Sequence, residues 1–157
     1  MSNGLWQEDP LRRLLEKDAV ISTVNRLFRS VDEKDWEGAE ACLAPSVLLD
    51  VTSMAGGEPE HTTGKAIVEG WRETLTPIAK VHHQAGNYEV QVRGEEANAS
   101  CYGIAVHYLP NDTGRDTRIF VGTYAMRLRK SGGAWRIYRF RYDLKFMDGN
   151  PDLEGEA

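Results

Sequence analysis

Four long strand patterns fill the second half of the chain, and the turns between them are short. The patterns cover residues 80 to 93, 97 to 109, 116 to 130 and 134 to 146. The turns lie at Gly94-Glu95, at Asn111 to Gly114 and at Ser131-Gly132-Gly133. Connections of this length join antiparallel neighbours, whereas parallel strands need a crossover of about a dozen residues or more. The sequence therefore predicts an antiparallel meander that has to bury one of its faces.

Helical patterns dominate the first half of the chain. Asp9 and Pro10 have the pattern of an N-cap and a first helical residue, and apolar residues then recur at spacings of three and four up to residue 32. The other expected elements are helices at 36 to 43 and 64 to 76, a strand at 47 to 51 and a loop at 54 to 63. We expect an α+β fold in which about three helices cover one face of a curved sheet.

The length of the chain is that of a single domain. Of the 157 residues, we expect 10 to 147 to form the domain, 1 to 9 to be an N-terminal extension and 148 to 157 to be a loose polar tail.

Charge and apolar patterning argue against two classes of partner. The formal net charge of -5 lacks the basic footprint of a protein that binds nucleic acid or an anionic membrane. The apolar runs are far shorter than the about 20 residues of a membrane-spanning helix. Cys42 and Cys101 lie on different predicted elements, so we expect free thiols and a cytoplasmic location. No spacing of histidines and cysteines indicates a metal site, and none is expected.

Strand parity predicts a hollow over the sheet. Cys101, Gly103, Ala105 and His107 share one face of their strand, and the bulky row of Tyr102, Ile104, Val106 and Tyr108 shares the other. We expect the small row to face the helices and to leave a cavity that contains His107. The bulky row would then form the outer face, where an apolar surface favours a homodimer or higher homo-oligomer. His82 and His83 are adjacent, so only one of them faces inward, and their neighbours do not decide which.

Three ionisable side chains have the chemistry of a proton-transfer site. Asp32 ends the long helical pattern, His83 lies near the start of one strand, and His107 lies near the end of the next. A carboxylate beside one imidazole, with a second imidazole opposite, can move protons at neutral pH because histidine titrates in that range. The hypothesis requires that the fold bring the three residues to one cavity.

The order of elements and several strings resemble a known superfamily over residues 10 to 146. The strings are Asp32-Glu33-Lys34-Asp35-Trp36, Ala44-Pro45, Leu49-Asp50-Val51, Gly64-Lys65-Ala66-Ile67 and His83-Gln84-Ala85-Gly86-Asn87. The chain resembles the nuclear transport factor two-like superfamily, and specifically its SnoaL-like branch. The resemblance implies a cystatin-like α+β barrel, in which a curved, antiparallel-rich mixed sheet forms a cone closed by the helices. Members of this superfamily have many functions, so the fold alone does not imply an activity.

Within the superfamily, the chain is similar to the scytalone dehydratases at Asp32, His83 and His107. The resemblance implies that Asp32 orients His107 and that the two imidazoles shuttle a proton during elimination of water, with no metal or organic cofactor. Two tyrosines of those enzymes fall on Val31 and Val51, and a pocket serine falls on Thr123. Valine donates no hydrogen bond, so such donors have to come from elsewhere, with Tyr102, Tyr124 and Tyr138 as candidates. The residues expected to line the pocket are Phe28, Val31, Val51, Trp71, Gly103, Ala105 and Thr123.

Asp50 offers a different chemistry. The chain also resembles the ketosteroid isomerases, whose general base falls on Asp50, and a polyketide-cyclase-like enzyme would use the same residue. Parity favours Val47, Leu49 and Val51 as the buried side of that strand, so Asp50 is the secondary candidate.

The leading hypothesis is a cofactor-independent lyase or isomerase that acts on a cyclic, largely apolar, oxygenated small molecule. The alternative is a domain of the same fold that binds a small molecule or dimerises without catalysis.

Overall fold

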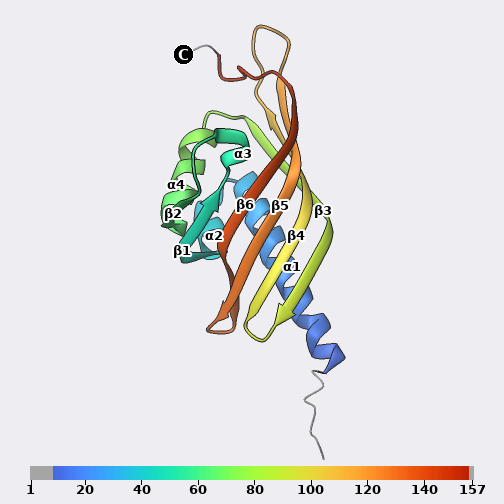
Figure 1. Ribbon diagram of the computed structural model, residues 1–157. Helices are drawn as coiled ribbons and strands as arrows, with labels where there is room; N and C mark the ends of the chain where they lie inside the picture. The colour runs from blue at the N-terminus through green and yellow to red at the C-terminus, as the bar shows by residue number, and fades with distance from the viewer. Residues whose placement is uncertain (1–8, 156–157) are drawn as a thin grey trace, which may run out of the picture.

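The computed structural model describes residues 9–155, so residues 1–8 of the expected N-terminal extension lie outside the described part. The elements in chain order are α1 (Pro10–Asp32), α2 (Trp36–Ala41), β1 (Leu43–Asp50), α3 (Thr52–Ala55), β2 (Glu60–Thr63), α4 (Gly64–Leu75), β3 (Lys80–Arg93), β4 (Glu96–Tyr108), β5 (Thr117–Ser131) and β6 (Ala134–Gly149) (Figure 1).

One six-stranded sheet has the order β2-β1-β6-β5-β4-β3. The strands β3 to β6 pair with their neighbours in antiparallel fashion, which confirms the predicted meander. The strand β1 joins β6 in parallel, so the sheet is mixed. The α+β class is confirmed, but the sheet is open, with β2 and β3 at its edges, and does not close into a barrel.

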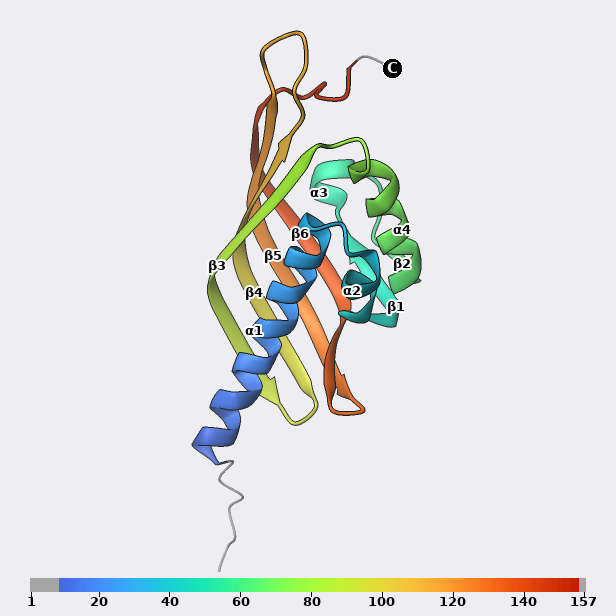
Figure 2. The same cartoon turned by 180° about the vertical axis from the view of Figure 1, so that it is seen from behind.

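The helix α1 crosses the inner face of the meander (Figure 2). Its start is fixed by Asp9, whose carboxylate accepts a hydrogen bond from the main-chain N–H of Leu11 at 3.1 Å, and by Pro10 at the first helical position. The buried face of the helix repeats at three and four residues: Val20, Val24, Leu27, Phe28 and Val31. This stripe packs on the sheet and places the last residue of the helix, Asp32, next to β3.

Several boundaries differ from the sequence prediction. The strand β1 begins at Leu43 and contains Pro45, which lies where the register with β6 is irregular, so the missing N–H breaks no regular ladder. The expected loop at 54 to 63 contains the second half of the short helix α3 and the whole edge strand β2. Residues 148–155 of the expected loose tail have defined structure, because β6 continues to Gly149 and Leu153 is 1% exposed, whereas residues 156 and 157 lie outside the described part.

The parity prediction for β4 is confirmed. Cys101 and Ala105 are buried on the inner face, whereas Tyr102 and Ile104 are 54% and 42% exposed on the outer face. Cys42 and Cys101 are both buried and free, as expected. Among residues 9–155, no helix has the length and apolar character needed to cross a membrane.

Candidate functional site

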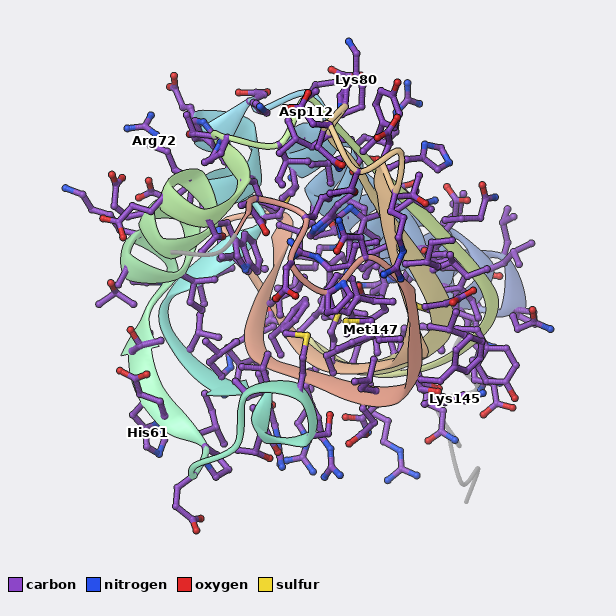
Figure 3. All side chains as sticks on the ribbon, turned by 90° about the horizontal axis from the view of Figure 1, so that it is seen from above. His61, Arg72, Lys80, Asp112, Lys145 and Met147 are labelled. Atoms are coloured by element: carbon purple, nitrogen blue, oxygen red, sulfur yellow. The ribbon has the colours of Figure 1, made fainter. Side chains whose placement is uncertain are left out.

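A cavity of about 190 Å³ lies between the helices and the inner face of the meander. Its walls are mostly apolar, and the polar side-chain atoms come from two histidines, two tyrosines, a threonine and a tryptophan. The lining residues are Leu27, Phe28, Val31, Val51, Met54, Trp71, Thr74, Leu75, His83, Ala105, His107, Phe120, Tyr124, Phe140 and Tyr142. His61, by contrast, is exposed on the edge strand β2, at the periphery of the molecule (Figure 3).

Asp32 and His83 form a close pair at the junction of α1 and β3. The carboxylate accepts hydrogen bonds from the main-chain N–H of His83 at 2.9 Å and from its ring Nδ1 at 2.6 Å. His82 is exposed, so His83 is the inward-facing member of the histidine pair. The ring of Phe28 stacks on His83 with centroids 5.2 Å apart and an interplanar angle of 14°. Because an ionised carboxylate only accepts, Nδ1 carries a proton, and in the neutral ring Nε2 is left with a free lone pair.

The pairing corrects the expectation that Asp32 orients His107. His83 lies on β3, the strand beside the end of α1, whereas His107 lies one strand further from that helix end. His107 has a different neighbour, because its Nδ1 is 3.2 Å from Nη2 of Arg118, its cross-strand partner on β5. His83 and His107 both line the cavity, whereas Asp32 does not line it and contacts it only through His83. Residue spacing alone could not assign these pairs.

The contact with Arg118 fixes which tautomer His107 adopts. A guanidinium has five N–H donors and no acceptor, so Nδ1 of His107 has to accept, and the neutral ring carries its proton on Nε2. Burial, with the charges of Arg118 and His83, lowers the pKa of His107 from 6.5 to about 4. At neutral pH, the neutral ring of His107 therefore offers an N–H donor to the cavity. The ring of His83, in its neutral form, offers a basic nitrogen.

Tyrosine rings fill part of the space that the sequence assigned to the cavity. A Cβ added at Gly103 would overlap the ring of Tyr124, and one added at Gly122 would lie 2.7 Å from the ring of Tyr142. The small residue at 103 thus makes room for a side chain of the protein, and Gly103 does not line the cavity. Thr123 does not line it either, because this residue pairs with Tyr102, on the outer face of the sheet.

The remaining expected lining residues, Phe28, Val31, Val51, Trp71 and Ala105, do line the cavity. Of the tyrosines that line the cavity, Tyr124 is a candidate donor from the sequence, whereas Tyr142 is not among those candidates. The sequence pattern that could have identified Tyr142 is the alternation along β6. Phe140 and Tyr142 are buried on the inner face of this strand, and Arg141 lies on the outer face.

Tyr142 has an unusual hydroxyl group. The oxygen is buried and has no hydrogen-bond partner among residues 9–155, although the residue lines the cavity. Burial raises the pKa of Tyr142 to about 12, so the group keeps its proton at neutral pH. Almost all buried hydroxyls have a partner, which makes this one an exception in the structure.

Asp50 is buried, with 8% of its surface exposed, but it does not line the cavity. Its carboxylate accepts from the hydroxyl of Thr52 at 2.7 Å and from the main-chain N–H of Thr52 at 3.3 Å. These bonds lower the pKa of Asp50, which makes it a weaker base. The carboxylate fits a local capping role before α3 better than the role of a general base.

Within residues 9–155, no group of three or more histidine, cysteine, aspartate or glutamate side chains could hold a metal ion.

Solved structures of several proteins share this fold. The Kfla4162 protein of Kribbella flavida has a TM-score of 0.82 and 17% identity, over 86% of this chain and 94% of that one. A provisionally named scytalone dehydratase of Novosphingobium aromaticivorans has a TM-score of 0.76 and 19% identity, over 87% and 89%. The type 3 hexachlorocyclohexane dehydrochlorinase of Novosphingobium barchaimii has a TM-score of 0.74 and 11% identity, over 95% and 99%. At these identities the likeness shows the fold alone.

The sequence itself identifies the family. No curated protein matches the chain. The family model of the SnoaL-like domain matches residues 12–141, which span both the helices and the meander around the cavity. The chain therefore belongs to the SnoaL-like domain family.

Proposed function

We propose that the protein is a cofactor-independent lyase or isomerase that acts on a small, cyclic, largely apolar and oxygenated molecule. One observation carries the proposal. Two imidazoles line one apolar cavity with opposite hydrogen-bonding capacity, since Asp32 holds the proton of His83 on Nδ1 and Arg118 leaves the proton of His107 on Nε2. A base and a donor around one space are the elements of proton transfer next to a carbonyl.

In this mechanism His83 is the general base. Its Nε2 takes a proton from the carbon next to the substrate carbonyl, and the C–H electron pair forms the enolate. Asp32 stabilises the imidazolium that forms, because its carboxylate is 2.6 Å from Nδ1. The Nε2–H group of His107 donates a hydrogen bond to the enolate oxygen, as a neutral imidazole does in other enzymes.

Loss of water then needs one more proton transfer. The enolate collapses to a C=C bond, the bond to a β-hydroxyl breaks, and the departing oxygen takes the proton from the His83 imidazolium. His107 is a poor source of this proton because its ring is neutral, with a pKa of about 4. The same base therefore removes and returns the proton, which favours syn elimination. Return of the proton to a different carbon would make the reaction an isomerisation.

The size of the cavity limits the substrate. A cavity of about 150 Å³ in another protein holds benzene, so about 190 Å³ here suits one ring or two small fused rings. The lining of Phe28, Val31, Trp71 and Phe140 favours an apolar skeleton. The donors on His107 and Tyr142 favour an oxygen substituent.

Deuterium exchange tests the proposal without knowledge of the substrate. Cyclic ketones of one or two rings, including cyclohexanone and 1-indanone, are incubated with the protein in D₂O, and exchange of the α-protons is followed by ¹H NMR. We expect faster exchange than in buffer for ketones that fit, and a return to the buffer rate in His83→Gln. Exchange that is unchanged in a folded His83→Gln variant would contradict the assignment of the base.

A non-catalytic binding domain is the second candidate. Val31 and Val51 line the cavity with side chains that donate no hydrogen bond, which suits a carrier of apolar ligands. His107→Ala separates the two functions. If the protein is an enzyme, this variant should lose turnover, while its Kd for the ligand stays within about tenfold of the wild-type value, a difference on the order of 1.4 kcal/mol. If the protein is a carrier, the wild type itself should show no turnover.

We also propose self-association through the outer face of the sheet. Ile104, Val121 and Phe146 are in register across β4, β5 and β6, and Phe146 is 55% exposed. A second copy related by a two-fold axis would cover this row with the same row. Sedimentation of the wild type and of Ile104→Lys tests this, with a dimer or larger oligomer expected only for the wild type. The free thiols of Cys42 and Cys101 support a cytoplasmic location.

A further inference from the structure

His107 is the first member of a chain of polar contacts that reaches the C-terminal segment. Nη2 of Arg118 is 3.2 Å from Nδ1 of His107 and 2.7 Å from Oε1 of Glu154. Nη1 of Arg118 donates to Oε2 of Glu154 at 2.8 Å and to the main-chain oxygen of Pro151 at 3.2 Å. The carboxylate thus holds the guanidinium through two parallel bonds, which fix its plane as well as its position. The Arg118 side chain is only 14% exposed.

The C-terminal segment is itself anchored, so Glu154 has a defined place. After β6 the segment lies beside the β4–β5 connection (Figure 1). The main-chain N–H of Asn150 donates to the oxygen of Thr117 at 2.7 Å, and its side-chain amide donates to the oxygen of Arg115 at 3.0 Å. Leu153 is 1% exposed and belongs to the hydrophobic core. These contacts therefore hold residues 150–154 in a defined position against the rest of the domain.

We propose that Arg118, held by Glu154, is a positioning residue that sets the tautomer of His107 and so makes Nε2–H the hydrogen-bond donor of the cavity. The role of that donor in a reaction rests on the proposed function, whereas the tautomer itself does not. Arg118 can only donate, so the ring nitrogen that faces it has to be the one without a proton.

The charges around His107 support the same state. Arg118 on β5 and His83 on β3 oppose a positive charge on the ring, while Glu154 and Asp32 favour one. Burial opposes the charge most strongly, and the net result is a lowered pKa for His107. Burial thus keeps the ring neutral, the charge of Arg118 adds to this effect, and Glu154 balances the charge of Arg118 itself.

Without Arg118, nothing would fix the tautomer of His107. Nδ1 of His107 would lose its donor, and the ring could then place its proton on either nitrogen. In the Nδ1–H tautomer, Nε2 accepts hydrogen bonds, and the cavity would contain two acceptors and lose a donor. Loss of one preorganised donor in other enzymes lowers kcat by about 10²- to 10³-fold. We expect a decrease of that size in kcat for Arg118→Met, with a smaller change in KM.

NMR on protein with ¹⁵N-labelled histidine tests the tautomer directly and needs no substrate. Long-range ¹H–¹⁵N correlations at pH 7 distinguish a protonated ring nitrogen from an unprotonated one. We expect the Nε2–H tautomer for His107 in the wild type and a mixture or the Nδ1–H tautomer in Arg118→Met. Arg118→Lys retains one donor and should restore the wild-type pattern in part. A wild-type His107 with its proton on Nδ1 would overturn the proposal before any variant is made.

The matched control is Arg129 on the same strand. It also pairs with a glutamate, since its Nε is 2.6 Å from Oε1 of Glu96, but the pair is exposed and lies away from the cavity. Arg129→Met should leave the His107 signals and the exchange of 1-indanone protons unchanged. Glu154→Gln provides a milder variant in case Arg118→Met does not fold, and it should broaden or shift the His107 signals.

The outcomes separate the two proposals. If Arg118→Met changes the tautomer while no ketone exchanges, the positioning role stands and the proposed reaction falls. If Arg118→Met folds and the tautomer stays unchanged, the positioning role is refuted, whatever the enzyme does.

Discussion

The carboxylate of Asp32 accepts two hydrogen bonds from a single residue, one from the main-chain N–H of His83 at 2.9 Å and one from its ring Nδ1 at 2.6 Å. The first bond ties the end of α1 to β3, and the second fixes the plane of the imidazole relative to that junction. The orientation of the candidate base therefore depends on how the helix docks on the sheet.

Asp32→Asn should impair the base while the fold is kept. The asparagine side chain carries no negative charge to stabilise the imidazolium, and its amide nitrogen would replace one of the two carboxylate oxygens that face donors of His83. The equivalent change in serine proteases lowers kcat about 10⁴-fold. We expect a decrease of roughly 10²- to 10⁴-fold in ketone proton exchange, measured by NMR. Glu33→Gln removes the neighbouring charge as a control, and an equal loss in that variant would contradict a specific role for Asp32.

Protonation of His107 should destabilise the fold at low pH. The pKa of His107 is about 4 in the folded chain and 6.5 in its reference state, so the unfolded chain binds more protons between these values. Stability consequently rises as the pH increases from about 4 to 6.5 and gains nothing more from this residue at higher pH. The contribution is up to about 3 kcal/mol, since each pKa unit corresponds to about 1.4 kcal/mol.

Urea unfolding at pH 7, 5.5 and 4.5 measures this effect in the wild type and in His107→Gln. Carboxyl groups with lowered pKa values, such as those of Glu16 and Glu154, also destabilise the fold at low pH, so only the difference between the two proteins reports on His107. The variant should show a flatter dependence between pH 5.5 and 7. Parallel curves would show that His107 is not buried in its neutral form.

The strand and helix periods of the sequence were sufficient to predict much of this fold. Strand patterns with short turns predicted the meander of β3 to β6, the helical spacing predicted the buried face of α1, and strand parity predicted the inward direction of His107. These features depend on periods of two and 3.6 residues, which a single sequence contains. The edge strand β2 was missed because its four residues, Glu60 to Thr63, are mostly polar and exposed.

The pairing of the polar groups could not be predicted in the same way. Which of Asp32 and Arg118 contacts which histidine depends on the position of the helix over the sheet and on strand register, and residue spacing defines neither. Arg118 was not singled out, since a lone arginine on a strand is usually solvated. Its partner Glu154 lies in a segment whose sequence is that of a loose polar tail, although Leu153 and the hydrogen bonds of Asn150 anchor that segment.

Tyr142→Phe should stabilise the free protein. The hydroxyl is buried without a partner among residues 9–155, and such a group costs about 1–3 kcal/mol of desolvation. Phenylalanine keeps the ring and its packing against Tyr124, so we expect a gain of about 1 kcal/mol, or about 2–4 °C in Tm. Tyr138→Phe is the control, because that hydroxyl donates to Glu96 at 2.9 Å and its removal should stabilise nothing. A lower Tm for Tyr142→Phe would mean that the hydroxyl has a partner in solution.

Gly103→Ala should destabilise the fold and disturb the cavity. The added methyl group would overlap the ring of Tyr124, which is 6% exposed and packs against Phe28 and Phe140. A forced shift of this ring costs about 1–3 kcal/mol, the usual range for overpacking, and moves one wall of the cavity. Gly86→Ala on the neighbouring strand is the control, since a Cβ there meets nothing within 4 Å and alanine suits a strand better than glycine. Thermal unfolding of both variants should show a clear loss only for Gly103→Ala, because only at that position does a protein ring occupy the space above the glycine. Equal Tm values for the two would show that Tyr124 moves away at little cost and that the wall it forms is not rigid.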